Sequence, residues 1–182
     1  MGDEADSLCP RFVIHLSENA SVSYSDWNRS LKPIPRITAL CVIRRERPHG
    51  REFLVQCADD EAFYRFPGGT IEFGETAADT IRREMREEYD LAVTVGPLWV
   101  VNENIFADRE QIGHAISLIH TGQLNQAIAV DAVRHKEYTD IKLVWRSPVA
   151  WATKPVYPAG IQAYLQAAME PIMHLVSPPG VR

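Results

Sequence analysis

The sequence predicts an α+β fold, in which helices pack on a mixed, mostly antiparallel sheet. Runs rich in β-branched and aromatic residues occur on both sides of one long amphipathic segment, so the elements are ordered strands, helix, strands. In addition, no internal repeat and no Gly/Ser-rich linker divides the 182 residues. The chain is therefore expected to form one domain with some decoration.

The expected strands are separated by turn-forming residues. The first is RITALCVIRR, residues 36–45, and the turn-rich ERPHG joins it to REFLVQC, which indicates an antiparallel hairpin with a medium loop. The segment FYRFPGG then leads into the long amphipathic stretch. Three more strand-like runs follow that stretch: LAVTVGPLWVVNENIF, which is interrupted by Gly96-Pro97, then GHAISLIHTGQL, and then DIKLVWRS.

The two ends of the chain are expected to differ from the middle. Residues 1–35 are rich in Ser, Asn and Pro, and we expect them to form an N-terminal extension that packs on the core. The main domain would then span residues 36–182. Within it, apolar residues recur at helical spacing from Ile161 to Ala168, which predicts a C-terminal helix that ends before Pro171.

Composition and charge argue against several classes of protein. The net charge is -5, and no run of Lys or Arg exceeds two residues, so bulk nucleic acid is not an expected partner. The cysteines Cys9, Cys41 and Cys57 are odd in number and form no CxxC pair, which favours a reducing, cytoplasmic location. The acidic N-terminus does not resemble a signal peptide, and no stretch approaches about 18 consecutive apolar residues, so no membrane span is expected.

The stretch GGTIEFGETAADTIRREMREEYDL is the most charged part of the chain. Thr76, followed three residues later by Asp79, is typical of a capping box, and no Gly or Pro interrupts residues 77–89. A helix is therefore predicted over residues 77–89. Its apolar positions recur every three or four residues and can pack on a sheet: Ala78, Ile81, Met85 and Tyr89.

Three glutamates are expected along one edge of this helix. Glu84, Glu87 and Glu88 stand at i, i+3 and i+4, so their carboxylates could converge on one ion. Like charges at this spacing repel unless a cation lies between them, and carboxylate oxygens favour Mg²⁺ or Mn²⁺ over zinc. Taken alone, however, RREMREE is also typical of a solvated helix face on which Arg83 pairs with Glu87.

The longer spacing separates these two interpretations. Six residues of defined type stand at fixed distances ahead of the apolar Leu91: Gly69, Glu75, Arg83, Glu84, Glu87 and Glu88. Such an array would arise by chance in a chain of this length at odds on the order of one in 10⁵. It resembles the Nudix box, here from Gly69 to Leu91. The one departure is Asp90, where the family has Gly; because Asp tolerates the left-handed conformation, we expect the helix to end there all the same.

The resemblance implies a Nudix-type α/β/α sandwich and an enzyme that hydrolyses a diphosphate linked to another moiety, with divalent cations. By position, Glu84 and Glu88 would be the principal ligands of Mg²⁺ or Mn²⁺, and Glu87 would be a further ligand or the base that activates water. The carbonyl of Gly69 would supply an additional oxygen ligand. Arg83 would hold a glutamate in orientation.

Candidates outside the box are less specific. In some Nudix enzymes a glutamate on a later loop is the general base or a further ligand, and Glu137 in RHKEYTDIKLVW is the candidate here. Glu103 and Asp140 are rivals for that role, and Glu103 is also a candidate substrate contact. Arg36, at the start of the first strand, could bind substrate phosphate. His114 could line the cleft. Each of these residues is also consistent with an ordinary surface position.

The expected substrate is a small-molecule nucleoside diphosphate derivative, such as a modified nucleotide, ADP-ribose or a dinucleoside polyphosphate, and no subfamily signature selects among them. The main alternative is a Nudix-fold module that binds or senses a nucleotide without hydrolysing it. Isomerisation of a prenyl diphosphate on a related fold would need a cysteine in the site, whereas Cys41 and Cys57 are expected in the core. Family members often dimerise, so a homodimer is possible.

Overall fold

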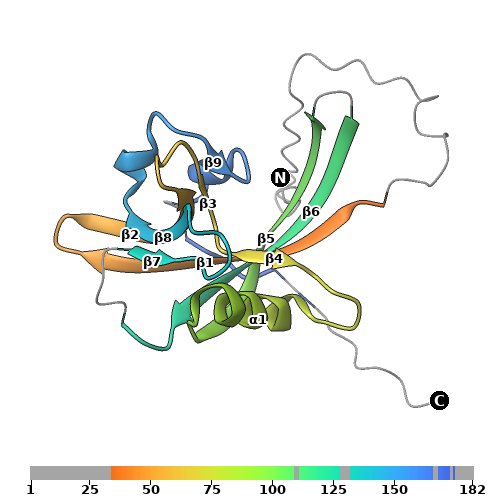
Figure 1. Ribbon diagram of the computed structural model, residues 1–182, viewed down its shortest axis with the longest axis horizontal. Coiled ribbons are helices and arrows are strands. Elements are labelled where there is room, and N and C mark those ends of the chain that lie inside the picture. The colour runs from red at the N-terminus through yellow and green to blue at the C-terminus, as the bar shows by residue number, and fades with distance from the viewer. Residues whose placement is uncertain (1–33, 109–110, 128–131, 166–167, 173, 175–182) are drawn as a thin grey trace, which may run out of the picture.

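The computed structural model describes residues 34–108, 111–127, 132–165, 168–172 and 174. Within these residues the chain forms strands, one α-helix and, after β8, two 3-10 helices, η2 and η3 (Figure 1). In chain order the elements are β1 (Arg36–Arg47), β2 (Gly50–Ala58), β3 (Tyr64–Arg65), β4 (Gly68–Thr70), α1 (Ala77–Tyr89), β5 (Val93–Asp108), β6 (Gln111–Leu124), β7 (Ala132–Arg134), β8 (Ile141–Arg146), η2 (Pro148–Trp151), β9 (Val156–Tyr157) and η3 (Ile161–Ala163).

These strands form one mixed sheet centred on β1. The main path runs β5-β6-β1-β2-β3-β9, while β4 pairs with β1, β8 with β2 and β7 with β8. The pairs β1–β6 and β3–β9 are parallel, and the others are antiparallel. The predicted mixed, mostly antiparallel sheet is confirmed. The hairpin between β1 and β2 is tighter than expected, because Arg47 lies opposite Gly50 and only Pro48 and His49 form its loop.

The strand β5 continues through Gly96 and Pro97, where the sequence suggested an interruption. The register to β6 shifts between Val95 and Leu98 and again before Val100. Glycine and proline are tolerated inside a strand at such irregularities. The hairpin of β5 and β6 extends away from α1 in Figure 1.

Alternation along β1 sends its side chains to two cores, one on each face of the sheet. Ala39, Cys41 and Ile43 lie beneath α1, in the cluster that also contains Ile81 and Met85 of the helix. Burying apolar side chains of this size contributes about 1.5–3 kcal/mol each, so this packing fixes α1 on the sheet. The opposite face carries a second cluster: Val42, Phe53, Val55, Cys57, Tyr64, Phe66, Trp99, Ile119, Val144, Trp151, Val156, Ile161 and Leu165.

The two described cysteines are core residues, as expected. Cys41 and Cys57 are buried free thiols, one in each cluster. Burial raises the pKa of the Cys41 thiol to about 12 and that of Cys57, with a contribution from Glu61, to about 11. Neither thiol is poised as a nucleophile.

The predicted C-terminal helix is wrong within the described residues. A 3-10 helix, η3, covers only Ile161–Ala163, and no α-helix follows in residues 164–165, 168–172 or 174. Ile161 and Leu165 are buried in the cluster around Trp151, so a spacing of four residues reflects turns that pack on the sheet. The segment between Pro158 and Pro171 is too short to form a stable helix without packing against other elements. In the described residues, 3-10 helices therefore stand where the α/β/α expectation placed a second helical layer.

The expected N-terminal extension, residues 1–35, lies outside the described residues except for its last two positions. Ile34, the first described residue, is exposed. Among the helices in the described ranges, none is both long enough and apolar enough to cross a membrane.

Candidate active site

The helix α1 begins at a side-chain cap. Thr76 Oγ1 accepts a hydrogen bond from the backbone N–H of Asp79 at 3.2 Å, and its hydroxyl donates to the Asp79 carboxylate at 2.7 Å. These contacts lower the pKa of Asp79. The capping box and the first helical residue predicted from the sequence are confirmed.

The helix ends at Tyr89 with Asp90 in the left-handed conformation, at φ 56° and ψ 34°. The Asp90 N–H donates to Arg86 O at 3.0 Å, and the next N–H, from Leu91, donates to Met85 O at 3.0 Å. Glycine is the residue that most often adopts this conformation after a helix. The prediction that Asp90 would still end the helix is confirmed.

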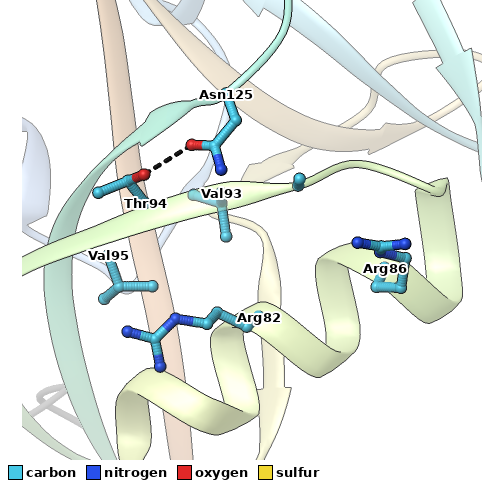
Figure 2. A pocket seen from close by; sticks show the side chains of 7 residues that line it. Arg82, Arg86, Val93, Thr94, Val95 and Asn125 are labelled. Atoms are coloured by element: carbon cyan, nitrogen blue, oxygen red, sulfur yellow. Dashed lines mark hydrogen bonds between the residues drawn. The ribbon is translucent and has the colours of Figure 1, made fainter.

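The buried stripe of α1 divides its polar residues into two flanks. The stripe consists of Ala77, Thr80, Ile81, Met85 and Tyr89. Because successive residues are about 100° apart, Arg83 and Glu87 lie on one flank, beyond Thr80, and Arg82 and Arg86 lie on the other, beyond Tyr89. Glu84 and Glu88 project between Thr80 and Ile81, and their side chains are only 15% and 21% exposed. The second flank faces β5 across a pocket with Val93, Thr94, Val95 and Asn125 in its lining (Figure 2). That pocket contains none of the predicted site residues.

Arg83 connects the acidic residues of the box. Its Nε donates to Glu75 Oε1 at 2.7 Å, and its Nη1 donates to Glu84 Oε1 at 3.0 Å and Glu87 Oε2 at 3.2 Å. Its Nη2 donates to Glu75 Oε2 and to the carbonyl of Thr70, at 3.0 and 3.2 Å. Arg83 lowers the pKa of Glu75 to about 2, and the carboxylates in turn raise the pKa of Arg83. One guanidinium thus offsets the repulsion within the glutamate cluster.

The glycine pair before the helix gives Glu84 its place. A Cβ on Gly69 would lie 2.0 Å from Glu84 Oε1, so the carboxylate occupies the space beside that glycine. Gly68 has a different reason, since its φ is +140° and a Cβ there would lie 2.0 Å from the carbonyl oxygen of Ala39 on β1. Because these two glycines have no side chain, β4 packs closely against β1 at Gly68 and against the Glu84 side chain of α1 at Gly69.

Glu88 lies deeper than Glu87. The Glu88 side chain is 21% exposed and the Glu87 side chain 61%. His135 Nε2 is 3.2 Å from Glu88 Oε1, and Gln56 Nε2 is 3.5 Å from Glu88 Oε2. Burial raises the pKa of Glu88, and the charge of Glu84 adds to this effect, whereas the contact with His135 opposes it.

The three glutamates are neighbours but do not point at one common position. Glu84 and Glu87 share Arg83, whereas Glu88 is held by His135. Within the described ranges, no set of three His, Cys, Asp or Glu side chains is arranged to hold a metal ion. The sequence prediction that these residues stand on one edge of the helix agrees with the structure, but their carboxylates are engaged with cationic or polar partners.

Two of the candidates outside the box come close to it. Arg36 Nε donates to Thr70 Oγ1 at 2.9 Å, so this arginine lies beside the strand that precedes the helix. The backbone N–H of Glu137 donates to His135 Nδ1 at 3.0 Å, and His135 in turn contacts Glu88. The Glu137 side chain is exposed.

The other two candidates lie on the β5–β6 hairpin. Glu103 pairs with Ile116, and His114 pairs with Ile105, so both lie on the same face of the hairpin. Among the described residues, no hydrogen bond or ion pair joins either side chain to the box helix. Asp140, the remaining rival, is exposed in the loop that carries Glu137.

Sequence reasoning missed several side chains around Glu88. The Gln56 carbonyl accepts from Arg65 Nε and the Gln56 amide donates to the Tyr89 hydroxyl, so these residues form a chain beside the carboxylate. Because arginine only donates, Arg65 fixes which way the Gln56 amide faces. His135 stands two residues before Glu137, and this proximity was the one sequence signal that could have identified it.

A mixed sheet that carries a glutamate-rich helix against a glycine pair defines a hydrolase domain of the type predicted from the box. The NUDIX domain family matches residues 34–159, which cover most of the chain. The chain therefore belongs to the NUDIX family, and it is a pyrophosphohydrolase that cleaves diphosphate linkages. A comparison with curated proteins gives no match.

Solved structures of similar proteins include the E. coli ORF135 protein, at 22% identity and a TM-score of 0.44, covering 71% of this chain and 88% of that one. A NUDIX hydrolase from Nitrosomonas europaea is 20% identical with a TM-score of 0.49, covering 64% and 75% of the two chains. An ADP-ribose pyrophosphatase from Streptococcus suis is 15% identical with a TM-score of 0.47, covering 68% and 81%.

Proposed function

We propose that this enzyme hydrolyses the diphosphate linkage of a nucleoside diphosphate derivative, with Glu84, Glu87, Glu88 and the carbonyl of Gly69 as ligands of Mg²⁺ or Mn²⁺. The observation that carries the proposal is the placement of the Glu84 carboxylate against Gly69. Arg83 holds the same carboxylate at 3.0 Å. A carboxylate that packs against a glycine and is held by an arginine has a defined position, whereas a carboxylate on a solvated helix face does not.

The donor set suits a hard divalent cation. It consists of carboxylate and carbonyl oxygens, which Mg²⁺ and Mn²⁺ prefer. Mg²⁺ usually takes only one or two carboxylates and completes its shell with waters and substrate phosphates, so a fully preformed protein cage is not required. When bound, such a cation would neutralise diphosphate charge and lower the pKa of water.

The protein side chains have separate tasks in this proposal. Arg83 keeps Glu84 and Glu87 side by side despite their like charges, because its Nη1 donates to both. Glu87 is the more exposed of these two glutamates, with 61% of its side chain exposed against 15% for Glu84. We assign Glu87 as a further ligand or as the group that accepts a proton from the attacking water, with Glu137 as the competing base.

The substrate would be contacted from two sides. Arg36, held beside the box through Thr70, is the candidate for a substrate phosphate. Glu103 and His114 on the β5–β6 hairpin are candidates for the group beyond the diphosphate. Arg65, which donates to the Gln56 side chain beside Glu88, is a second cation near the box.

The test is turnover of a panel of diphosphates by the purified chain with Mg²⁺, with Mn²⁺ and with EDTA. The panel contains a modified nucleoside triphosphate, ADP-ribose and a dinucleoside polyphosphate. Hydrolysis in ¹⁸O-labelled water shows which phosphorus receives the new oxygen. We expect cation-dependent release from at least one of these substrates, and loss of that activity with EDTA.

Two variants separate the candidate bases. Glu87→Gln and Glu137→Gln remove one carboxylate each without changing side-chain size. General-base catalysis typically contributes about 10²–10⁴-fold, so the variant lacking the true base should lose activity in that range. Nucleotide binding by the wild-type enzyme without hydrolysis of any panel member would instead favour the binding-module alternative.

A further inference from the structure

His135 occupies a closed position between the box helix and the loop that follows β7. The residue is 4% exposed, and its ring lies edge-on to Tyr89 at 5.2 Å and to Tyr138 at 4.9 Å between centroids. The two tyrosine rings restrict its rotation. The ring therefore keeps one orientation, and each of its nitrogens faces a different set of partners.

One ring nitrogen accepts two backbone hydrogen bonds. The N–H of Glu137 lies 3.0 Å from His135 Nδ1, and the N–H of Tyr138 lies 3.2 Å from the same atom. A nitrogen that accepts from backbone N–H groups must present its lone pair, so Nδ1 carries no proton. The proton of the neutral ring is then on Nε2.

The protonated nitrogen faces the glutamate. His135 Nε2 lies 3.2 Å from Glu88 Oε1, so the Nε2–H donates to that carboxylate. On the other side of Glu88, Gln56 offers its amide N–H to Oε2 at 3.5 Å. Two neutral donors thus fix the orientation of the Glu88 carboxylate, and neither competes with a cation as an arginine would.

The backbone of the same loop caps the helix. The Lys136 N–H donates to the Glu88 carbonyl at 2.8 Å, and Lys136 Nζ lies 3.4 Å from the carbonyl of Arg86. Carbonyls in the last turn of a helix lack partners within it, so this loop satisfies part of the end of α1. The loop that carries Glu137 is consequently tied to Glu88 through both the backbone and the His135 ring.

From these contacts we infer that His135, as the Nε2–H tautomer, is a positioning residue that orients Glu88 for a divalent cation. It also fixes the position of the Glu137 loop against α1. This inference rests on the proposed function, in which Glu88 is a cation ligand. Groups that orient a ligand from behind typically change metal affinity by about 10- to 100-fold when they are removed.

Two substitutions of His135 separate the roles of its two ring nitrogens. His135→Asn places an oxygen near the Nδ1 position, so it can still accept from the loop N–H groups but cannot donate to Glu88. His135→Gln places an amide N–H near the Nε2 position, so it can still donate to Glu88 but loses the loop acceptor. Arg82→Gln, on the opposite flank of α1, is the matched control.

The first measurement needs neither metal nor turnover. Nitrogen-15 NMR of the resting wild-type protein at near-neutral pH reports which ring nitrogen carries the proton. We expect the Nε2–H tautomer for His135. A proton on Nδ1, alone or on both nitrogens, overturns the inference, because the two backbone bonds could not then form.

The second measurement is Mn²⁺ affinity by titration, without substrate. We expect His135→Asn to weaken binding by roughly 10- to 100-fold, His135→Gln to restore most of it, and Arg82→Gln to match the wild type. Equal affinity in His135→Asn and the wild type overturns the inference. Mn²⁺ binding by the wild type without hydrolysis of any diphosphate contradicts the proposed function and leaves the assignment of His135 intact.

Discussion

The carboxylate of Glu84 fills the space that a side chain at Gly69 would occupy. A Cβ at residue 69 would approach Glu84 Oε1 to 2.0 Å and Cδ to 2.3 Å. The glycine is thus required by a neighbouring side chain, because its own φ lies outside the left-handed region. Gly68 is required by the backbone of β1, so adjacent glycines serve different purposes.

Gly69→Ala is therefore expected to reduce activity more than stability. The added methyl group must displace the Glu84 carboxylate, whose loss of position should weaken cation affinity by about 10- to 100-fold. Gly68→Ala should instead destabilise the fold, since its methyl group meets the carbonyl of Ala39 at 2.0 Å and its φ is +140°. Mn²⁺ titration and urea unfolding of both variants measure the contrast. Equal effects of the two variants on Mn²⁺ affinity would contradict it.

Arg83 and Arg82 provide a matched pair on one helix. Arg83 contacts Glu75, Glu84 and Glu87, whereas Arg82 pairs with the exposed Asp79 at 3.0 Å. We expect Arg83→Gln to lower kcat/KM by about 10- to 100-fold and to reduce the free energy of unfolding by about 1 kcal/mol, because a partly exposed network is screened by solvent. Arg82→Gln should change both by little. Steady-state kinetics and urea unfolding decide, and comparable losses in the two variants would refute a special role for Arg83.

The box helix could be predicted closely because its determinants are local. The cap at Thr76, the unbroken helical run and the left-handed Asp90 all act within a few residues of one another, and the structure places α1 at the predicted bounds. The C-terminal segment has a similar spacing, but there Ile161 and Leu165 pack into a core made by distant strands, which a local pattern does not report.

The surroundings of Glu88 show what local sequence could not supply. His135 reaches Glu88 from 47 positions further along the chain, by a loop between β7 and β8, and Gln56 reaches it from β2, 32 positions before. These contacts follow from strand order and register. The box motif identified which residues cluster, whereas the partners that hold each carboxylate depended on the tertiary fold.

Asp90 tests the one departure from the family pattern. The left-handed conformation costs an ordinary L-residue about 1–2 kcal/mol, and β-branched residues are especially disfavoured there. Asp90→Val should therefore lower the free energy of unfolding by about 1–2 kcal/mol. Asp90→Gly should stay within about 0.5 kcal/mol of the wild type, because relief of strain is offset by the greater freedom of glycine in the unfolded chain. Urea unfolding measures both, and a stable Asp90→Val variant would count against this view of the helix end.

Glu61 forms a polar centre in the loop between β2 and β3. Its carboxylate accepts from Arg146 Nε at 2.9 Å and from the Tyr64 hydroxyl at 2.7 Å, and Lys142 Nζ is 3.3 Å away. The hydrogen bonds from Arg146 are the main cause that lowers the pKa of Glu61 to about 2. Its side chain is 18% exposed, so solvent screens these contacts only in part.

The lowered pKa of Glu61 predicts a stability that depends on pH. Because the carboxylate has a lower pKa in the folded than in the unfolded chain, its contribution is fully present above about pH 4.5 and is lost as the pH falls toward about 2. Glu61→Gln should lower the free energy of unfolding by about 1–3 kcal/mol near neutral pH, and the difference from the wild type should shrink steadily in acid.

Glu46→Gln is the control, since Glu46 is 66% exposed in its pair with Arg51 and such pairs contribute about 0–1 kcal/mol. Urea unfolding of the three proteins across this range of pH gives the comparison. A difference between wild type and Glu61→Gln that stays constant with pH would show that the charge of Glu61 does not contribute, and that its effect comes from packing alone.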